Sequence, residues 1–299
     1  VDLSRVIREP LVLALTKVIL ITGLLAFDSG KTWFTYNVAN YALSRGLRVS
    51  IYKPVAGHDA WTQHHTIEIS RELKLLLGHD VSLYAELLKV EPSKLHLVNP
   101  VDLLLSPLDV ELYLNSIESF YKDMEDQFSR IVLSRVSNCR KKTSSHFLVR
   151  ENIARVPRFL RDEISSLAEE LSAEAIDLKT LLSLLTSREI SIELNYCLEE
   201  LAGESDLVLV ESFNNAVLPY IDLRSSVRKI VVVSVGKALI YDDPGEVWKV
   251  IDEGLKEEAL QSLITEYFVG RIKPSIVVDI RPRKDVRVID EGSAIEVID

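Results

Sequence analysis

The chain has 299 residues, of which 47% are hydrophobic and 27% charged, and its net charge at neutral pH is −10. This balance is typical of a folded globular protein and excludes a disordered chain. An acidic chain also disfavours nucleic acid as a partner. No apolar run reaches the roughly 18 residues of a membrane helix. The sequence therefore predicts a cytoplasmic protein with no membrane partner.

Oxidation-sensitive and heat-labile residues are scarce, with one Met, two Cys and three Gln in the chain. This composition is typical of a protein from a heat-adapted source. Cys139 and Cys197 stand far apart without a paired-cysteine motif. We therefore expect neither zinc nor a disulfide framework, and predict two buried thiols.

Short apolar runs alternate with longer amphipathic ones along the chain. The apolar runs predict strands at Val18–Thr22, Leu47–Tyr52, Ile131–Val136, Leu207–Val210, Ile230–Val235, Ile276–Val278 and Val286–Ile289. The amphipathic runs predict helices at Thr32–Arg45, Thr66–Leu77, Leu108–Phe128, Arg158–Ala173, Leu178–Leu201 and Gly245–Leu263. The prolines at positions 100 and 107 indicate a loop between the second and third helices.

This alternation predicts an α/β fold with a doubly wound, mostly parallel sheet and helices on both faces. Ligands of such sheets bind beyond the carboxyl ends of the strands. The candidate functional residues of this chain fall at those positions.

A phosphate-binding loop is predicted between the first strand and the first helix, where Asp28 and Ser29 precede Gly30, Lys31 and Thr32. Gly30 lets the backbone approach a phosphate, and the helix N-terminus supplies positive potential. Lys31 would reach the β- and γ-phosphates, and Thr32 would hold Mg²⁺. The strict pattern has glycine where this chain has Leu25, so an ordinary helix start with a solvated lysine is the alternative.

Two further charged residues end predicted strands. Lys53 follows the second strand and Glu211 follows the strand at 207–210. An acid at that position can supply a second metal contact. The alternative for both is an ordinary strand-end surface charge.

The order of these motifs resembles dethiobiotin synthetase and its relatives, which include the cobyrinate amidases. The resemblance rests on Gly30-Lys31-Thr32, Tyr52-Lys53-Pro54-Val55, the two prolines at 100 and 107, the acid strand that ends at Glu211, and Gly236-Lys237. It covers residues 18–109 and 178–263. It implies a P-loop NTPase fold, ATP and Mg²⁺ as cofactors, and an active site at a homodimer interface.

The resemblance also implies roles for individual residues. Lys31 and Lys53 are then the catalytic residues, and Lys53 also binds the substrate amine or carbamate. The nucleotide contacts are Asp28, Ser29, Gly30, Lys31, Thr32 and Thr35. The metal contacts are Thr32, Glu211 and Asp59, and the turn with Ser212 and Asn214 lies against the substrate. His58 is a further predicted substrate contact because of its position after Lys53, not because of the resemblance.

The chain departs from this family in two segments. Ser212 to Asn215 replace a glycine-rich turn that faces the substrate, which predicts a different substrate. Residues 116–175 are predicted to be an insertion within a single domain over 1–299. Its basic turn, Arg140 to Lys142, could guide an anionic substrate or an RNA end, or be solvated.

Three histidines, His58, His64 and His65, lie near Asp59 in the sequence. Such a group could ligate a transition metal. Adjacent histidines on a helix point in different directions, however, so the pattern favours a polar loop beside the nucleotide.

These observations predict a Mg²⁺-dependent ATPase or ligase that activates a carboxylate or carbamate for attack by an amine, with a small-molecule acceptor. One alternative is a nucleotide-dependent switch that binds a protein partner. Another is a kinase of nucleic-acid 5′ ends, because Asp28-Ser29-Gly30-Lys31-Thr32 also resembles the loop of polynucleotide kinases.

Overall fold

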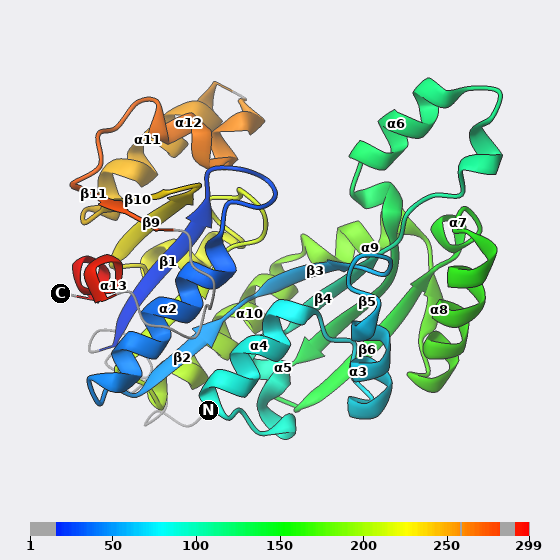
Figure 1. Ribbon diagram of the computed structural model, residues 1–299, viewed down its shortest axis with the longest axis horizontal. Helices are drawn as coiled ribbons and strands as arrows, with labels where there is room; N and C mark the ends of the chain where they lie inside the picture. Colours follow the sequence, from blue (N-terminus) through cyan, green and yellow to red (C-terminus); the bar gives the residue numbers. More distant parts are fainter. Residues whose placement is uncertain (1–15, 258, 282–290, 299) are drawn as a thin grey trace. The chain divides into compact units, whose positions relative to one another are not determined.

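The computed structural model describes residues 16–257, 259–281 and 291–298 (Figure 1). The fold is α/β, as predicted, with two mixed β-sheets. The chain divides into two compact units. Unit 1 comprises Val1–Pro54, Leu87–Lys89 and Asn195–Asp299, and unit 2 comprises Val55–Glu86 and Val90–Leu194.

Unit 1 contains a six-stranded sheet with the order β11-β10-β9-β1-β8-β2. Its strands are β1 (Lys17–Gly23), β2 (Val49–Tyr52), β8 (Leu207–Glu211), β9 (Lys229–Ser234), β10 (Lys237–Tyr241) and β11 (Ile276–Asp279). β1 runs parallel to β8 and β9, and β2 runs parallel to β8. β10 runs antiparallel to both of its neighbours.

The central strands of this sheet are apolar because both of their faces are covered. In β1, residues 18–21 have no exposed surface, and neither do residues 208–210 of β8. Ile21 pairs with Glu211 and Tyr52 pairs with Val210, so β1, β2 and β8 end at one edge of the sheet. That edge carries the residues predicted to bind a ligand.

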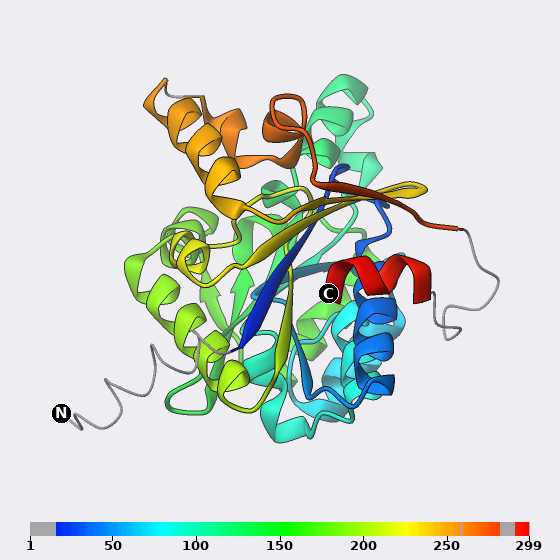
Figure 2. The same ribbon diagram turned by 90° about the vertical axis from the view of Figure 1, so that its left-hand side faces the viewer.

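Several helices surround this sheet. They are α2 (Lys31–Ser44), α11 (Pro244–Lys256), α12 (Thr265–Val269), α13 (Glu291–Ile298) and the short 3-10 helices η4 (Ile221–Ser225) and η5 (Leu260–Leu263). Asp243 caps α11 by accepting a hydrogen bond from the Gly245 N–H. α13 lies beside α2, where the Asn37 amide donates to the Ser293 hydroxyl (Figure 2).

Unit 2 contains a five-stranded sheet with the order β3-β4-β5-β6-β7. Its strands are β3 (Val55–Asp59), β4 (Val101–Leu105), β5 (Ile131–Asn138), β6 (Thr143–Val149) and β7 (Glu174–Ile176). β3 runs parallel to β4, and β6 runs parallel to β7. β5 runs antiparallel to β4 and β6, and the basic turn at 140–142 joins β5 to β6.

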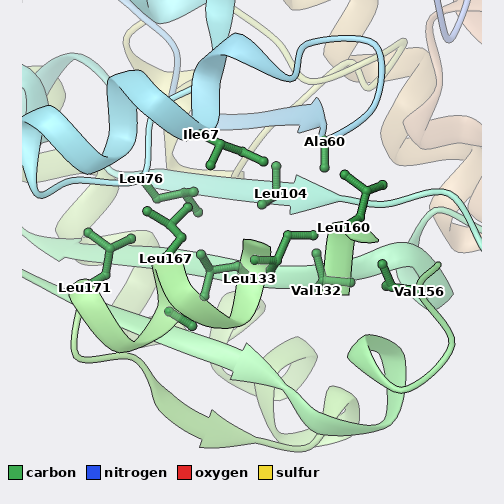
Figure 3. Packing of buried hydrophobic residues seen from close by; sticks show 12 residues of the cluster. Ala60, Ile67, Leu76, Leu104, Val132, Leu133, Val156, Leu160, Leu167 and Leu171 are labelled. Atoms are coloured by element: carbon green, nitrogen blue, oxygen red, sulfur yellow. The ribbon is translucent and has the colours of Figure 1, made fainter. Parts of the chain in front are cut away.

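The helices of unit 2 are mostly short. They are α3 (His65–Leu73), α4 (His79–Leu88), η1 (Pro92–Lys94), α5 (Leu95–Val98), η2 (Val110–Tyr113), α6 (Ile117–Glu125), η3 (Phe128–Arg130), α7 (Arg150–Ile153), α8 (Arg158–Glu170) and α9 (Leu178–Leu185). α4 and α10 (Arg188–Gly203) contain residues of both units. Leu160, Ile164 and Leu167 of α8 pack on Leu104 and Leu133 of the sheet, and these residues belong to the apolar cluster drawn in Figure 3.

The strands predicted at 18–22, 47–52, 131–136, 207–210, 230–235 and 276–278 are confirmed, and the strand at 286–289 lies outside the described residues. The loop predicted between the two prolines is wrong, because Val101–Leu105 forms the fully buried strand β4. The helix predicted over 178–201 is divided into α9 and α10.

The single helix predicted over 108–128 is also wrong, because the segment contains η2, α6 and η3. Its polar residues bond to the local backbone instead of continuing a helix. Asp109 accepts from the Glu111 N–H, and Asp126 accepts from the Phe128 N–H. No residue of α6 is buried.

Cys139 and Cys197 are buried as predicted but are not thiols, because both are disulfide-bonded. Two cysteines without a paired-cysteine motif gave no sequence signal for a disulfide bond. The predicted insertion, 116–175, lies wholly within unit 2, which begins much earlier, at Val55.

Candidate functional site

The loop between β1 and α2 is built for close backbone approach. Gly30 has φ +85° and precedes Lys31, the first residue of α2. Asp28 also has a positive φ, +53°. Two left-handed residues within three positions turn the chain sharply into the helix N-terminus, where backbone N–H groups and the helix dipole favour an anion.

In this loop the glycine against which other loop atoms pack is Gly23, two positions before Leu25, where the strict pattern has its glycine. A Cβ on Gly23 would lie 2.5 Å from Ser29 Oγ, 2.8 Å from Lys31 Nζ and 2.9 Å from the Leu25 carbonyl oxygen. The loop therefore folds back onto Gly23, and only glycine fits there. The side chain of Leu25, which replaces the expected glycine, is 46% exposed and does not fill the loop.

Within the loop, the Lys31 ammonium donates to Ser29 Oγ at 3.3 Å, and Ser29 is buried. Phe27 is 60% exposed and Trp33, in the first turn of α2, is 43% exposed. The Lys31 side chain thus contacts the loop itself, whereas the side chains of Phe27 and Trp33 are exposed to solvent.

An acid, a lysine and a hydroxyl converge beside this loop. The Lys53 Nζ lies 2.8 Å from Glu211 Oε1, and the Thr32 hydroxyl donates to the same oxygen at 3.4 Å. The side chains of Lys53 and Glu211 are 7% and 1% exposed. Lys53 and Glu211 are therefore not surface charges in water, which was the alternative interpretation of their sequence positions. The structure brings Lys31, Thr32, Lys53 and Glu211 to one edge of the sheet.

The donor set at this edge suits Mg²⁺. Within the described ranges, no group of three or more His, Cys, Asp or Glu side chains could hold a metal ion. Mg²⁺ needs no such group, because it binds one or two carboxylates and completes its shell with waters and substrate phosphates. The Thr32 hydroxyl and the Glu211 carboxylate are the oxygens present here.

The segment after β8 is held by its own hydrogen bonds. The Ser212 N–H donates to the Ile21 carbonyl at 2.9 Å, and the Ser212 hydroxyl donates to the Ala216 carbonyl at 2.6 Å. Asn214 has φ +48°. Ser212 is fully buried, so its hydroxyl shapes the turn, and the turn carries Asn214 at its tip.

Thr35, predicted to bind the nucleotide, lies on the buried face of α2. Its side chain is fully buried, and the hydroxyl has no hydrogen-bond partner. Its burial gives no support to a nucleotide contact, which stays a prediction.

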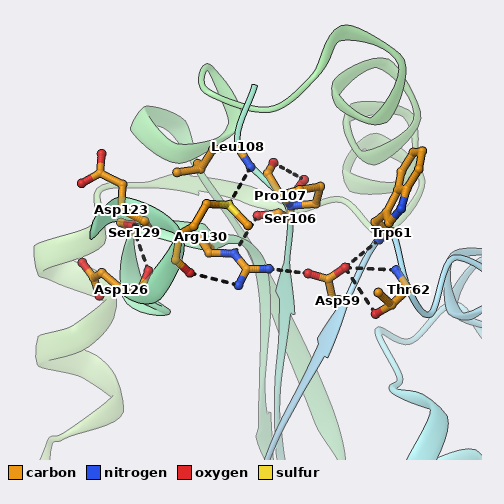
Figure 4. A network of polar contacts seen from close by, with 11 residues as sticks. Asp59, Trp61, Thr62, Ser106, Pro107, Leu108, Asp123, Asp126, Ser129 and Arg130 are labelled. Carbon is orange, nitrogen blue, oxygen red and sulfur yellow. Dashed lines mark hydrogen bonds and ion pairs between the residues drawn. The ribbon is translucent and has the colours of Figure 1, made fainter. Parts of the chain in front are cut away.

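Asp59, the third predicted metal ligand, lies in unit 2 and is engaged there (Figure 4). The Arg130 guanidinium lies 2.5 Å from Asp59 Oδ2. Asp59 Oδ1 accepts from the N–H groups of Trp61 and Thr62 at 3.0 and 3.1 Å. These contacts explain Asp59 without a metal.

The histidines do not converge on Asp59. His58 is buried, and its Nδ1 lies 2.9 Å from Asp102 Oδ1, outside hydrogen-bond alignment. His64 Nε2 contacts Glu163 at 2.8 Å, and His65 Nε2 contacts His79 Nδ1 at 3.0 Å. The predicted roles of His58 and Asp59 concern a site with residues of unit 1, and each is explained by contacts within unit 2.

Sequence reasoning missed a row of buried ionisable side chains in unit 2. Asp102, Arg135 and His146 are directly opposite one another on β4, β5 and β6. Arg135 has no exposed surface, and burial lowers its pKa to about 10. Burial, helped by the charge of Arg135, lowers the pKa of His146 to about 4. For two members of the row the available signal was a charged residue within an apolar run, Asp102 at 101–105 and Arg135 at 131–136, whereas His146 follows a polar segment and gave no such signal.

This row fixes the segment between α3 and α4. His146 Nε2 accepts from the Leu76 N–H at 3.2 Å, and Asp102 Oδ2 accepts from the Gly78 N–H at 3.1 Å. The His146 ring is therefore an acceptor at Nε2, which requires its neutral form. Side chains of the row thus accept hydrogen bonds from two buried backbone N–H groups, and Asp102, Arg135 and His146 are all buried from solvent.

The comparisons give no family for this chain. No family model matches it, and no curated protein matches it. Among the described residues, no helix is long and apolar enough to cross a membrane.

Proposed function

We propose that unit 1 binds a nucleoside triphosphate with Mg²⁺ and uses it to activate a carboxylate or carbamate for attack by an amine. The observation that carries this proposal is the convergence of Thr32 and Lys53 on one oxygen of Glu211, beside the N-terminus of α2. A phosphate site and a metal site are then adjacent at one edge of the sheet.

The strand order supports the same proposal. The four parallel strands lie in the order β9-β1-β8-β2, so the chain leaves β1 between neighbours that come later in the sequence. In a doubly wound sheet, the place where the strand order reverses is called a topological switch point, and a crevice for ligands lies there beyond the carboxyl ends of the strands. We take unit 1 as a P-loop NTPase fold on this basis, with the acid strand β8 directly beside the loop strand β1.

Each residue has a stated task in this mechanism. The amides near Gly30, the α2 N-terminus and the Lys31 ammonium hold the phosphates and stabilise charge that develops during transfer. Thr32 and Glu211 would hold Mg²⁺, which neutralises the phosphate oxygens when bound. Lys53 orients the anionic acceptor.

The reaction itself balances as a double displacement. An acceptor oxygen takes the γ-phosphoryl group while the bond to the nucleoside diphosphate breaks. The amine nitrogen then attacks the activated carbonyl, loses a proton and displaces inorganic phosphate. Positioning and charge stabilisation supply most of the rate in phosphoryl transfer, which suits a site with few ionisable groups.

The experiment is release of inorganic phosphate from ATP with Mg²⁺, alone and with diamines, amino acids and dicarboxylates. We expect one acceptor class to stimulate release, and Lys31→Ala to abolish it. Lys74→Ala is the matched control, because Lys74 is an exposed lysine of unit 2 that contacts Glu170. Wild-type phosphate release by Lys31→Ala contradicts the proposal.

One observation favours a second candidate, a nucleotide-dependent switch that binds a protein partner. Four apolar side chains of η2, α6 and the turn between them are exposed, namely Leu112 at 60%, Leu114 at 73%, Ile117 at 47% and Tyr121 at 64%. Exposed apolar clusters often mark contact surfaces. Stimulation of phosphate release by a protein, with no small-molecule acceptor, would favour this candidate.

A further inference from the structure

The buried Lys53–Glu211 contact occupies the oxygen that the proposed metal would use. Lys53 directly follows β2 and Glu211 ends β8, and these strands are paired in parallel. Lys53 Nζ lies 2.8 Å from Glu211 Oε1, and Thr32 Oγ1 lies 3.4 Å from the same atom. The contact is shielded from water, since only 7% and 1% of the two side chains are exposed.

A carboxylate this deeply buried requires a cation, because desolvation of an unpaired charge is costly. The ammonium of Lys53 meets that requirement in the metal-free protein. A divalent cation at Glu211 would meet it as well, but two cations on one buried oxygen repel each other strongly. The ammonium and the divalent cation therefore compete for Glu211.

We propose that Lys53 is a built-in cation that holds Glu211 until a divalent cation replaces it, an inference that rests on the proposed function. After the exchange, the Lys53 ammonium can contact the anionic groups of a bound nucleotide or acceptor. It can do so only when the metal is bound. The device couples the two events, because Lys53 engages its reaction partners only after the metal is in place.

The proposed exchange moves a side chain and leaves the backbone in place. β2 and β8 are paired strands, and Pro54 fixes the backbone immediately after Lys53. The lysine side chain carries a compact charge on a flexible four-carbon stem, so a change of its rotamer is what the exchange requires. The moving part is then one side chain on a rigid edge.

The test is Mn²⁺ binding to the full chain without nucleotide, measured by electron paramagnetic resonance of the free ion. Because the competing ammonium is gone, we expect Lys53→Met to bind Mn²⁺ roughly tenfold or more tightly than wild type. The double variant Lys53→Met/Glu211→Gln should return to weak binding. Lys53→Gln keeps a hydrogen-bond donor without charge and should tighten binding as Lys53→Met does.

Lys229→Met is the matched control for the loss of a buried lysine. Lys229 is 7% exposed, begins β9 at the opposite end of the sheet and contacts Asp242 at 3.2 Å. This variant should bind Mn²⁺ as wild type does. Thermal melts of each variant verify that it is folded, and Lys53→Gln provides the test where Lys53→Met does not fold.

Mn²⁺ affinities of Lys53→Met and Lys53→Gln that equal wild type overturn the exchange. The proposed function can fail separately. Tighter Mn²⁺ binding by the Lys53 variants, together with no nucleotide binding by wild type, would leave the exchange intact and refute the nucleotide site. Normal nucleotide binding by wild type, together with unchanged Mn²⁺ affinity in the Lys53 variants, would refute the exchange and leave the nucleotide site intact.

Discussion

Replacing Gly23 by alanine tests whether the loop works through close packing on the end of β1. The added Cβ would lie 2.5 Å from Ser29 Oγ, 2.8 Å from Lys31 Nζ and 2.9 Å from the Leu25 carbonyl oxygen. The Lys31 side chain can bend away. The short Ser29 side chain and the Leu25 backbone cannot, so the loop itself must move.

The size of that movement sets the expected effect. An ordinary van der Waals contact is 3.4 Å or longer, so Ser29 Oγ must retreat by about 0.9 Å. A misplacement of about 1 Å in a positioned site costs on the order of a hundredfold. We expect Gly23→Ala to weaken nucleotide binding by about 10- to 100-fold, or about 1.4–2.7 kcal/mol.

Isothermal titration calorimetry with Mg²⁺ and nucleotide measures this directly. Gly46→Ala is the matched control, since Gly46 has φ +80° and its added Cβ would meet nothing within 4 Å. It should cost about 1–2 kcal/mol of stability through its left-handed backbone but leave the affinity unchanged. Wild-type affinity in Gly23→Ala, or an equal loss in both variants, refutes the reasoning.

Three further outcomes are expected. Because burial holds the pKa of His146 at about 4 against the ordinary 6.5, the unfolded chain binds a proton that the folded chain excludes. The free energy of unfolding should therefore fall by up to about 3 kcal/mol as the pH drops from about 6.5 to about 4. Urea unfolding of His146→Gln should lack this loss, and the same pH dependence in the variant and in wild type would contradict the prediction. Asp59→Asn should lower stability by about 1 kcal/mol through loss of its Arg130 contact and leave Mg²⁺ dependence unchanged, whereas a tenfold loss of Mg²⁺ affinity would restore its metal role. Trp33, 43% exposed beside Thr32, should change its fluorescence when nucleotide binds; a signal that persists in Trp33→Phe would have another source.

The residues of the loop and of the neighbouring strand ends could be predicted because their signals are local. An apolar run followed by a loop and Gly30-Lys31-Thr32 predicts a strand, an anion site and a helix, and β1 and α2 are found there. Glu211 and Lys53 each end an apolar strand. In parallel strands, such ends share one edge.

Other features depend on which strands become neighbours, and no local pattern records this. Asp102, Arg135 and His146 form a row only through the registers of β4, β5 and β6. The packing role of Gly23 likewise depends on how a long loop folds back, because a search at fixed spacing points to Leu25 instead.

The helix predicted over 108–128 failed for a related reason. Its apolar residues recur at helical spacing, but the helical path is broken at Ser116, which has φ −156°, and at Asp126, whose side chain accepts from the Phe128 N–H. α6 has no buried residue, so its apolar spacing marked no core face.

The most direct measurement of the central claim is calorimetric binding of ATP, GTP and CTP, with and without Mg²⁺, to wild type and to Lys31→Ala. We predict Mg²⁺-dependent binding of at least one of these nucleotides by wild type, and a loss of about a hundredfold or more in Lys31→Ala. Lys74→Ala, which alters an exposed lysine of unit 2, should bind as wild type does. Failure of wild type to bind any nucleotide, or equal binding by Lys31→Ala, would contradict a nucleotide site at the edge formed by β1, β2 and β8.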